Sequence, residues 1–226
     1  MDVDQIVEGI SNYEFERKFY VSPDAKIPQQ AQSLVVQAFV YVGEEYSIRI
    51  RMEGDEKYLN MVNLASKDGL PYLCSHINSV VHGLFTIKQI DECRMGIRYE
   101  KEMSIEADAC RQILTEVAER NPERIIVKMR RSFVVEDSQR TWGWDIDTFL
   151  LDNAPLVIAE CEDKEPITNL LIPSFCRTEV TGDVRFSNSS LARNPFRRWC
   201  DKWLKKLEND GPTFLDSFGD NRFDDI

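Results

Sequence analysis

The chain contains 226 residues, 42% of them hydrophobic and 30% charged, and its formal net charge is −11. This hydrophobic content supports a packed core and excludes a chain that is disordered throughout. The negative net charge disfavours binding to nucleic acid or anionic lipid, unless positive side chains are gathered at one place.

The chain shows no targeting or membrane signal. No apolar run approaches the roughly 20 residues that a membrane-spanning helix needs, and no basic segment followed by an apolar one stands at the N-terminus. We therefore expect a cytoplasmic protein. The six cysteines are scattered without a C-x-x-C pair, which favours reduced thiols over a zinc ribbon or a redox motif.

Alternation of polar and apolar residues, rich in aromatic and β-branched side chains, predicts about eight β-strands. In chain order these are Tyr13–Tyr20, Ala38–Val42, Ser47–Met52, Leu84–Ile90, Arg94–Glu102, Ile125–Val135, Trp142–Leu150 and Leu156–Glu162. Helical periodicity predicts helices over residues 31–36, 107–120 and 194–207.

Two segments lack clear periodicity. Residues 53–83 read as an insertion between two strands, and the acidic tail after Asp210 is expected to fray. Because no repeat or linker divides the chain, we predict a single α+β domain over residues 1–226, with the C-terminal helix and tail at residues 194–226.

Charged residues share one face of most predicted strands, because side chains at i, i+2 and i+4 of a strand point to the same side. The first strand carries a mixed set, Glu14, Glu16 and Lys18. Basic strands then supply Arg49, Arg51, Lys88, Lys128 and Arg130, whereas acidic strands supply Asp145, Asp147, Glu160 and Glu162. The two signs are therefore segregated by strand.

Two interpretations of this pattern are open. The charged faces are the solvated side of an antiparallel sheet, or the sheet closes into a barrel with its charges inside, for which about eight strands suffice. Segregation of the signs favours the barrel. Charges enclosed in this way are costly unless a ligand matches both signs. A polyphosphate with divalent cations does so, because cations bind phosphate oxygens and carboxylates hold the metal.

The sequence Glu14-Phe-Glu16-Arg-Lys18 matches the E-x-E-x-K signature of the CYTH superfamily, which contains class IV adenylate cyclases, thiamine triphosphatases and bacterial inorganic triphosphatases. The chain resembles this superfamily, also called triphosphate tunnel metalloenzymes, from Tyr13 to about Ala192. The main departure is the long segment at residues 53–83, for which a lid or a partner surface is expected. The resemblance continues in order through Ser47-Ile-Arg49-Ile-Arg51, Phe85-Thr-Ile-Lys88, Arg98-Tyr-Glu100-Lys-Glu102, Lys128-Met-Arg130, Trp144-Asp-Ile-Asp147-Thr-Phe, Ile158-Ala-Glu160-Cys-Glu162 and Glu179-Val-Thr-Gly-Asp-Val-Arg185-Phe-Ser-Asn188-Ser-Ser-Leu.

The resemblance implies a closed eight-stranded antiparallel barrel, a tunnel with a charged interior, surrounded by a few helices. It also implies a Mg²⁺ or Mn²⁺ cofactor held by Glu14, Glu16, Asp147, Glu160 and Glu162. The expected phosphate ligands are Lys18, Arg49, Arg51, Lys88, Lys128 and Arg130, with Arg185 near the tunnel mouth. The expected catalytic residues are Glu16, Glu162 and Lys18, where one of the two glutamates orients the attacking water.

These residues predict a metal-dependent triphosphatase, with inorganic tripolyphosphate as the favoured substrate because no base- or thiamine-recognition motif is evident. The alternatives are a class IV adenylate cyclase, in which the same metals activate a ribose hydroxyl, and a thiamine triphosphatase. A non-enzymatic module that senses polyphosphate or nucleotide is disfavoured, because binding alone needs fewer metal ligands. We expect no nucleic-acid or membrane partner, and a homodimer is left open.

A zinc site is the competing interpretation of the insertion, which carries Cys74, His76 and His82. Three such residues in an irregular segment without a fourth ligand are more typical of a structural role. Zinc is therefore not expected.

Overall fold

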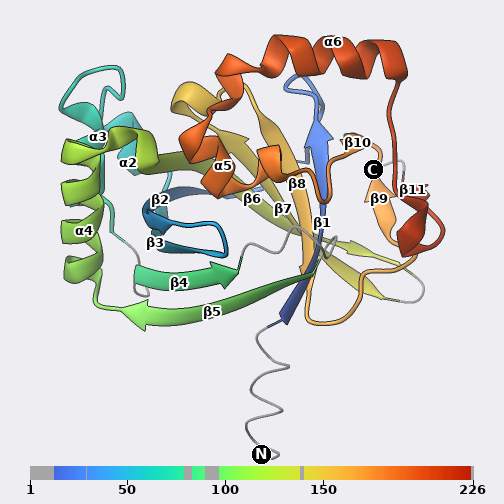
Figure 1. Ribbon diagram of the computed structural model, residues 1–226, viewed down its shortest axis with the longest axis horizontal. Coiled ribbons are helices and arrows are strands. Elements are labelled where there is room, and N and C mark those ends of the chain that lie inside the picture. The colour runs from blue at the N-terminus through green and yellow to red at the C-terminus, as the bar shows by residue number, and fades with distance from the viewer. Residues whose placement is uncertain (1–12, 29, 79–82, 90–96, 138–139, 225–226) are drawn as a thin grey trace, which may run out of the picture.

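The computed structural model describes residues 13–28, 30–78, 83–89, 97–137 and 140–224. Nine strands form one antiparallel sheet in the order β10-β1-β5-β4-β3-β2-β6-β7-β8, and an additional pairing of β1 with β8 closes eight of them into a barrel (Figure 1). The strands are β1 (Tyr13–Val21), β2 (Gln32–Val42), β3 (Tyr46–Asp55), β4 (Gly83–Gln89), β5 (Ile97–Ile105), β6 (Ile125–Glu136), β7 (Thr141–Phe149), β8 (Val157–Asp163) and β10 (Cys176–Glu179). The closed eight-stranded barrel predicted from the sequence is confirmed.

Helices surround the barrel: α2 (Lys57–Asn60), α3 (Gly69–His76), α4 (Ala107–Arg120), α5 (Asn188–Arg193) and α6 (Cys200–Asp210). The first three lie together on one side of the molecule, and α6 crosses the side opposite β4 and β5 (Figure 1). A separate two-stranded parallel sheet joins β9 (Leu171–Pro173) to β11 (Arg222–Asp224). Among the described residues, no helix has the length and apolar character that crossing a membrane requires.

Strand β1 closes the barrel because it pairs along both of its edges. One edge pairs with β8 from Phe15 to Val21. The other edge pairs with β5 at residues 13–15 and with β10 at residues 19–21. Between these two pairings, the backbone of Lys18 bonds to the turn that follows β10, accepting from Val180 N at 2.8 Å and donating to Thr181 Oγ1 at 2.9 Å.

Two apolar clusters cover the outside of the barrel. On one side, alternate residues of β2, β3 and β6 pack against α3 and α4, with Leu34, Leu73 and Leu114 each fully buried. On the other side, the outward face of β1, β7 and β8 packs beneath residues 167–176. Trp142 and Trp144 belong to this second cluster and act as packing residues there. The charged residues predicted for the site on the same strands are thereby directed inward, because neighbouring side chains of a strand alternate between faces.

A third apolar cluster lies where the strands β1, β2, β6, β7 and β8 meet α5 and α6. Tyr20 and Ile158 continue the inward-facing series of β1 and β8 and pack with Phe186, Leu191 and Trp203. This part of the barrel interior is therefore filled with aromatic and aliphatic side chains, so the ionic interior is confined to the remaining part.

The helix predicted over residues 31–36 is wrong, because these residues lie at the start of β2. Leu34 and Val36 are buried against the helices outside the barrel, whereas Val35 and Gln37 are buried on the inner face. A strand that is buried on both faces reads as a continuous apolar run, which periodicity does not distinguish from a short helix.

The predicted helix over residues 107–120 is confirmed as α4. The one predicted over 194–207 is confirmed in part, since a short 3₁₀ turn, Phe196–Arg198, precedes α6. The tail expected to fray is instead ordered over its described residues. It pairs with β9 through β11, and Leu215 N donates to the buried carboxylate of Glu179 at 2.8 Å.

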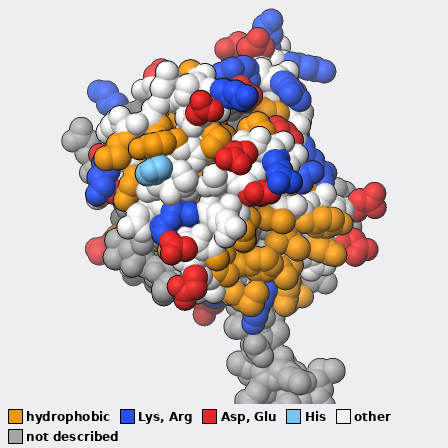
Figure 2. Space-filling view, turned by 90° about the vertical axis from the view of Figure 1, so that its left-hand side faces the viewer, with side chains coloured by type: hydrophobic (Ala, Val, Ile, Leu, Met, Phe, Trp, Pro, Cys, Tyr) orange, Lys and Arg blue, Asp and Glu red, His pale blue; other side chains and the backbone are white. Residues whose placement is uncertain are grey.

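The segment at residues 53–83 completes β3 and then forms α2 and α3. Leu70, Leu73 and Ile77 are buried against α4, and the face that these helices form carries interspersed charges of both signs (Figure 2). None of the described residues from 53 to 83 lines the cavity inside the barrel. The described part of this segment therefore covers the barrel wall and does not form a lid.

Candidate active site

A cavity of about 1770 Å³ reaches into the barrel from the side of the β2–β3 hairpin and the start of α5. Its wall is dominated by ionic side chains from six strands, β1, β3, β4, β5, β6 and β8, which overturns the interpretation of these charges as a solvated outer face. Of the residues predicted for the site, the cavity is lined by Glu14, Lys18, Arg49, Arg51, Lys88, Arg130, Glu160 and Glu162.

One ionic cluster joins β6 and β7. Arg130 donates two parallel hydrogen bonds to Asp147, from Nε to Oδ1 and from Nη2 to Oδ2, both 2.7 Å long. Lys128 donates to the same carboxylate from deeper in the wall, where both it and Asp147 are almost completely buried. Burial by itself would raise the pKa of Asp147, but Lys128 and Arg130 hold that pKa below its usual value. Asp147 is thus an anion whose two oxygens already accept from cations.

Strands β1 and β8 extend this cluster through Lys18. Its ammonium nitrogen lies 2.6 Å from Glu160 Oε1 and 3.3 Å from Glu16 Oε1. Arg130 approaches the other oxygen of Glu160 at 3.6 Å. Burial would raise the pKa of Glu160, yet Lys18 together with Lys128 and Arg130 holds it well below its usual value. The carboxylate at this position is therefore ionised.

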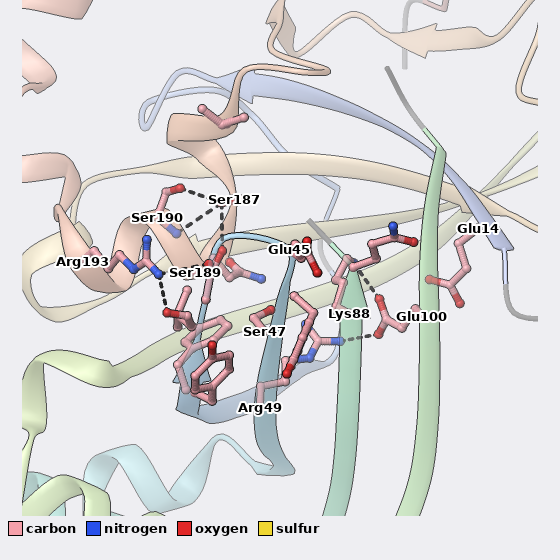
Figure 3. Close-up of a pocket in the computed structure, with 18 of the residues that line it drawn as sticks. Glu14, Glu45, Ser47, Arg49, Lys88, Glu100, Ser187, Ser189, Ser190 and Arg193 are labelled. Carbon is pink, nitrogen blue, oxygen red and sulfur yellow. Dashed lines mark hydrogen bonds and ion pairs between the residues drawn. The ribbon is translucent and has the colours of Figure 1, made fainter. Parts of the chain in front are cut away.

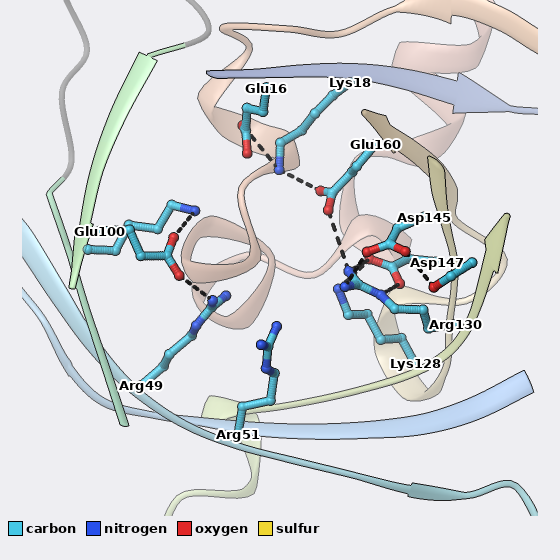
Figure 4. Close-up of polar contacts among 12 residues, drawn as sticks. Glu16, Lys18, Arg49, Arg51, Glu100, Lys128, Arg130, Asp145, Asp147 and Glu160 are labelled. Carbon is cyan, nitrogen blue, oxygen red and sulfur yellow. Dashed lines mark hydrogen bonds and ion pairs between the residues drawn. The ribbon is translucent and has the colours of Figure 1, made fainter. Parts of the chain in front are cut away.

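A second ionic cluster lies on the opposite wall, on β3, β4 and β5 (Figure 4). Glu100 is its centre, with Arg49 Nη2 at 2.7 Å and Lys88 Nζ at 2.6 Å. Although burial opposes ionisation, these cations lower the pKa of Glu100 to about 2. Arg51 makes a longer contact of 3.4 Å to Glu102 and points into the space between the two clusters. The two clusters therefore face one another across the cavity.

Three carboxylates come together where β1 meets β8. Glu16 and Glu162 are opposite one another in the register of the two strands, and Glu160 is the next inward-facing residue of β8. Burial, followed by the charges of Glu160 and Glu16, raises the pKa of Glu162 to about 7. An excess of negative charge at one place favours a bound cation, and carboxylate oxygens are the ligands that Mg²⁺ and Mn²⁺ prefer.

The donor set thus fits a hard divalent cation in its chemistry. Within the described ranges, however, no group of three or more His, Cys, Asp or Glu side chains has the arrangement of a formed metal site. Two of the five predicted metal ligands also lie apart from the three clustered glutamates. Asp147 is held by Lys128 and Arg130, and Glu14, although it lines the cavity, pairs with Lys164 at 2.8 Å.

Arg185 does not line the cavity. Its guanidinium is turned onto Asp183, with Nε 2.9 Å from Oδ1, and its side chain is half exposed. The cation that does line the cavity mouth is Arg193 of α5, which donates to the carbonyl of Val42 at 2.6 Å beside the serines at the start of α5 (Figure 3). Arg193 was not predicted as a site residue, because helix α5 is too short to show a periodic pattern.

The histidine and cysteine of the insertion do not form a site. Cys74 is fully buried between α3 and α4, whereas the ring of His76 is stacked 3.9 Å from that of Tyr72 at the surface. His82 lies outside the described residues.

The chain forms a closed antiparallel barrel, and opposite walls of this barrel present paired cations and carboxylates to one cavity. These features define the class of tunnel-shaped β-barrels with an ionic interior. No family model matches the chain. An inorganic triphosphatase from Acetivibrio thermocellus is 30% identical over 187 residues, which cover 82% of this chain and 97% of the relative. The chain therefore belongs to the CYTH, or triphosphate tunnel, superfamily, in the same family as that inorganic triphosphatase.

Solved structures show more distant likeness. A crystal structure of an inorganic triphosphatase matches with a TM-score of 0.46 and 20% identity, over 79% of this chain and 93% of the other. A putative adenylyl cyclase from Hippeastrum, described as having a dominant triphosphatase activity, matches with a TM-score of 0.39 and 12% identity, over 68% of this chain and 80% of the other. Neither likeness is close enough to bear on the chemistry of this chain.

Proposed function

We propose that this chain is a metal-dependent triphosphatase that cleaves a phosphoanhydride bond, with inorganic tripolyphosphate as the favoured substrate. The observation that carries the proposal is the opposition of two ionic clusters across one cavity. Arg49, Lys88 and Glu100 of β3, β4 and β5 lie on one wall, and Lys18, Arg130 and Glu160 of β1, β6 and β8 lie on the other. The relationship to an inorganic triphosphatase supports the same reaction.

The basic residues bind the phosphate chain. Arg49, Arg51 and Lys88 reach the cavity from one wall and Arg130 from another. A guanidinium offers a planar fork of N–H donors that matches two phosphate oxygens, and an ammonium adds a compact charge. When a linear triphosphate lies between the two clusters, its oxygens replace some of the barrel's carboxylates as partners of these basic residues.

Glu16, Glu160 and Glu162 would hold Mg²⁺ or Mn²⁺, and the metal would supply charge neutralisation at the phosphate oxygens. Their carboxylates also accept hydrogen bonds from water. Either Glu16 or Glu162 is thereby placed to orient the attacking water in line with the terminal phosphate. Hydrolysis needs little covalent chemistry from the protein, so positioning and electrostatics by these residues account for the reaction.

The test is phosphate release from tripolyphosphate, ATP and thiamine triphosphate, with Mg²⁺ or Mn²⁺, beside an assay for cyclic AMP. We expect phosphate release, fastest from tripolyphosphate, and its loss when EDTA removes the metal. Cyclic AMP formation from ATP without phosphate release would reject the hydrolase in favour of a cyclase.

Three further expectations belong to this proposal and rest on the sequence. They are a cytoplasmic location, the absence of nucleic-acid and membrane partners from a chain of net charge −11, and a homodimer as the open possibility for its assembly. Sedimentation of the purified chain measures the last of these directly.

A further inference from the structure

Gln37 is a neutral polar residue enclosed among the charged side chains of the barrel. It stands on β2 opposite Arg51 of β3 and Ile126 of β6. Its neighbours Val36 and Ala38 belong to the cluster outside the barrel, so its own side chain points inward, in phase with Phe39, which lines the cavity. Gln37 is 0% exposed.

Both polar atoms of this side chain lack a hydrogen-bond partner among the described residues. An amide buried in this way has lost its hydrogen bonds to water without replacing them, so it is uncommon where nothing uses it. The nearest facing residues share the condition, since the Nε atoms of Arg49 and Arg51 are also buried without a partner. An unused acceptor, Gln37 Oε1, therefore lies on the inner face of β2, opposite a strand that carries unused donors.

From this complementarity we infer that Gln37 is a positioning residue of the phosphate site. Directly opposed residues of an antiparallel pair have Cβ atoms about 4.5–5.5 Å apart, which brings Gln37 Oε1 within reach of the Arg51 guanidinium. Within the described ranges, the ion pair that Arg51 makes is its 3.4 Å contact to Glu102, a length at which a hydrogen bond is weak.

When a phosphate chain occupies the cavity, the Gln37 carbonyl accepts from Arg51 Nε and fixes the guanidinium, and its amide N–H₂ group donates to a phosphate oxygen. A neutral amide is suited to this place, because it can accept from a cation and donate to an anion at once. A carboxylate there would repel the phosphate, and an ammonium would repel Arg51. This inference rests on the proposed function for its ligand, a phosphate chain.

Two variants test the roles of the amide carbonyl and of the amide N–H₂ group of Gln37. Gln37→Met keeps the length of the side chain but removes both polar atoms, and Gln37→Glu keeps the acceptor for Arg51 while it replaces the donor with a negative charge. Val40→Ala, on the same strand but at a residue 43% exposed, is the matched control.

Two readouts are used: calorimetric titration with tripolyphosphate in the presence of EDTA, and KM and kcat for phosphate release with Mg²⁺. We expect Gln37→Met to weaken binding and raise KM about tenfold or more, as for loss of a hydrogen bond to a charged group, with an unfolding midpoint equal to or above that of the parent. Gln37→Glu weakens binding further, and Val40→Ala leaves both values unchanged.

Parental affinity in a folded Gln37→Met or Gln37→Glu protein overturns the inference, because a purely structural amide would not affect the ligand. If one variant does not fold, the other gives the same decision. Failure of the proposed function looks different: the parent chain then releases no phosphate from any substrate, while the titration with tripolyphosphate still reports whether Gln37 contributes to phosphate binding.

Discussion

At the scale of single residues, the site is built from groups whose neighbours set their charge. Glu162 and Glu100 show the two extremes. The first is surrounded by carboxylates and has a pKa raised to about 7, chiefly by burial, and the second is paired with cations and has a pKa lowered to about 2 in spite of burial. At neutral pH the same residue type is thus partly protonated in one wall and ionised in the other.

Glu16 is the residue whose removal is expected to stop the reaction with least effect on the fold. Gln in its place keeps the shape and removes one of three adjacent carboxylates, so like-charge repulsion falls while the water-orienting oxygen is lost. We expect Glu16→Gln to lower kcat by about 10²- to 10⁴-fold, in the range of general-base effects, with the unfolding midpoint preserved. Glu56→Gln, at an exposed position, serves as the control. Parental turnover in Glu16→Gln would remove Glu16 from the catalytic set.

Glu100 is expected to control stability in acid. Its folded pKa is depressed from 4.5 to about 2, so its pairing with Lys88 and Arg49 contributes stability above about pH 4.5, and this contribution is lost as the pH falls towards 2. The shift corresponds to an effect on the order of 3 kcal/mol. Glu100→Gln should be less stable at pH 7 and should lose less stability between pH 4.5 and 2. Urea midpoints measure both effects.

The control for this measurement is Glu102→Gln, because Glu102 is more exposed and its contact to Arg51 is longer. An acid profile of Glu100→Gln that matches the parent profile would show that Glu100 does not govern this transition.

At the scale of elements, β1 serves two sides of the molecule. Its inward residues Glu16 and Lys18 face the ionic interior, and between them Arg17 points outward into complete burial. Arg17 donates to Glu179 of β10 at 2.9 Å and 2.7 Å and to Asn221 of the C-terminal segment at 2.9 Å. Through Arg17, the outer side of the strand that carries the E-x-E-x-K signature is therefore bound to β10 and to the C-terminal segment.

Loss of the contacts that Arg17 makes with Glu179 and Asn221 should destabilise the whole fold. Arg17→Ala leaves the Glu179 carboxylate buried without its guanidinium partner, and breaking a buried pair on one side typically costs about 3–5 kcal/mol. Replacement of both partners, in Arg17→Met with Glu179→Leu, should recover part of this loss because no charge is then left unpaired. Urea unfolding of the single and double variants tests the expectation, which fails if Arg17→Ala has the parental midpoint.

The elements differ in how much of their structure the sequence predicts. The charged strands were predicted because ionic residues alternate visibly with apolar ones. The segregation of signs favoured their closure into a barrel, and the resemblance to the CYTH superfamily implied it. The start of β2 was mistaken for a helix because both of its faces are buried. Gln37 of the same strand was not predicted as a site residue, because a neutral side chain does not contribute to a pattern of charges. Arg193 was missed and Arg185 was favoured, because only the fold reveals which arginine turns onto a local aspartate.

At the scale of the whole molecule, an acidic chain encloses a concentrated set of ionic side chains. The cavity gathers cations together with carboxylates within a protein of net charge −11. Under the proposed function, we expect small, highly charged anions that enter the barrel to be favoured over extended ones.

Tripolyphosphate should therefore stabilise the folded protein even without turnover. In the presence of EDTA and at a concentration of about 100 times its Kd, a ligand adds about 2.7 kcal/mol to the free energy of unfolding, which for a chain of this length raises Tm by about 5–10 °C. Thermal unfolding with tripolyphosphate, compared with sulfate at equal ionic strength, measures the effect. Equal shifts for the two anions would indicate general screening instead of a fitted site.

The attachment of the C-terminal segment to the back of β1 also defines the smallest fragment worth expressing. A chain cut after α6 would keep every barrel strand and every cavity residue, yet it would leave Arg17 facing water without Asn221 and would strip the Leu215 amide from Glu179. The minimal working unit therefore extends at least to Asn221, well beyond the last residue that touches the cavity.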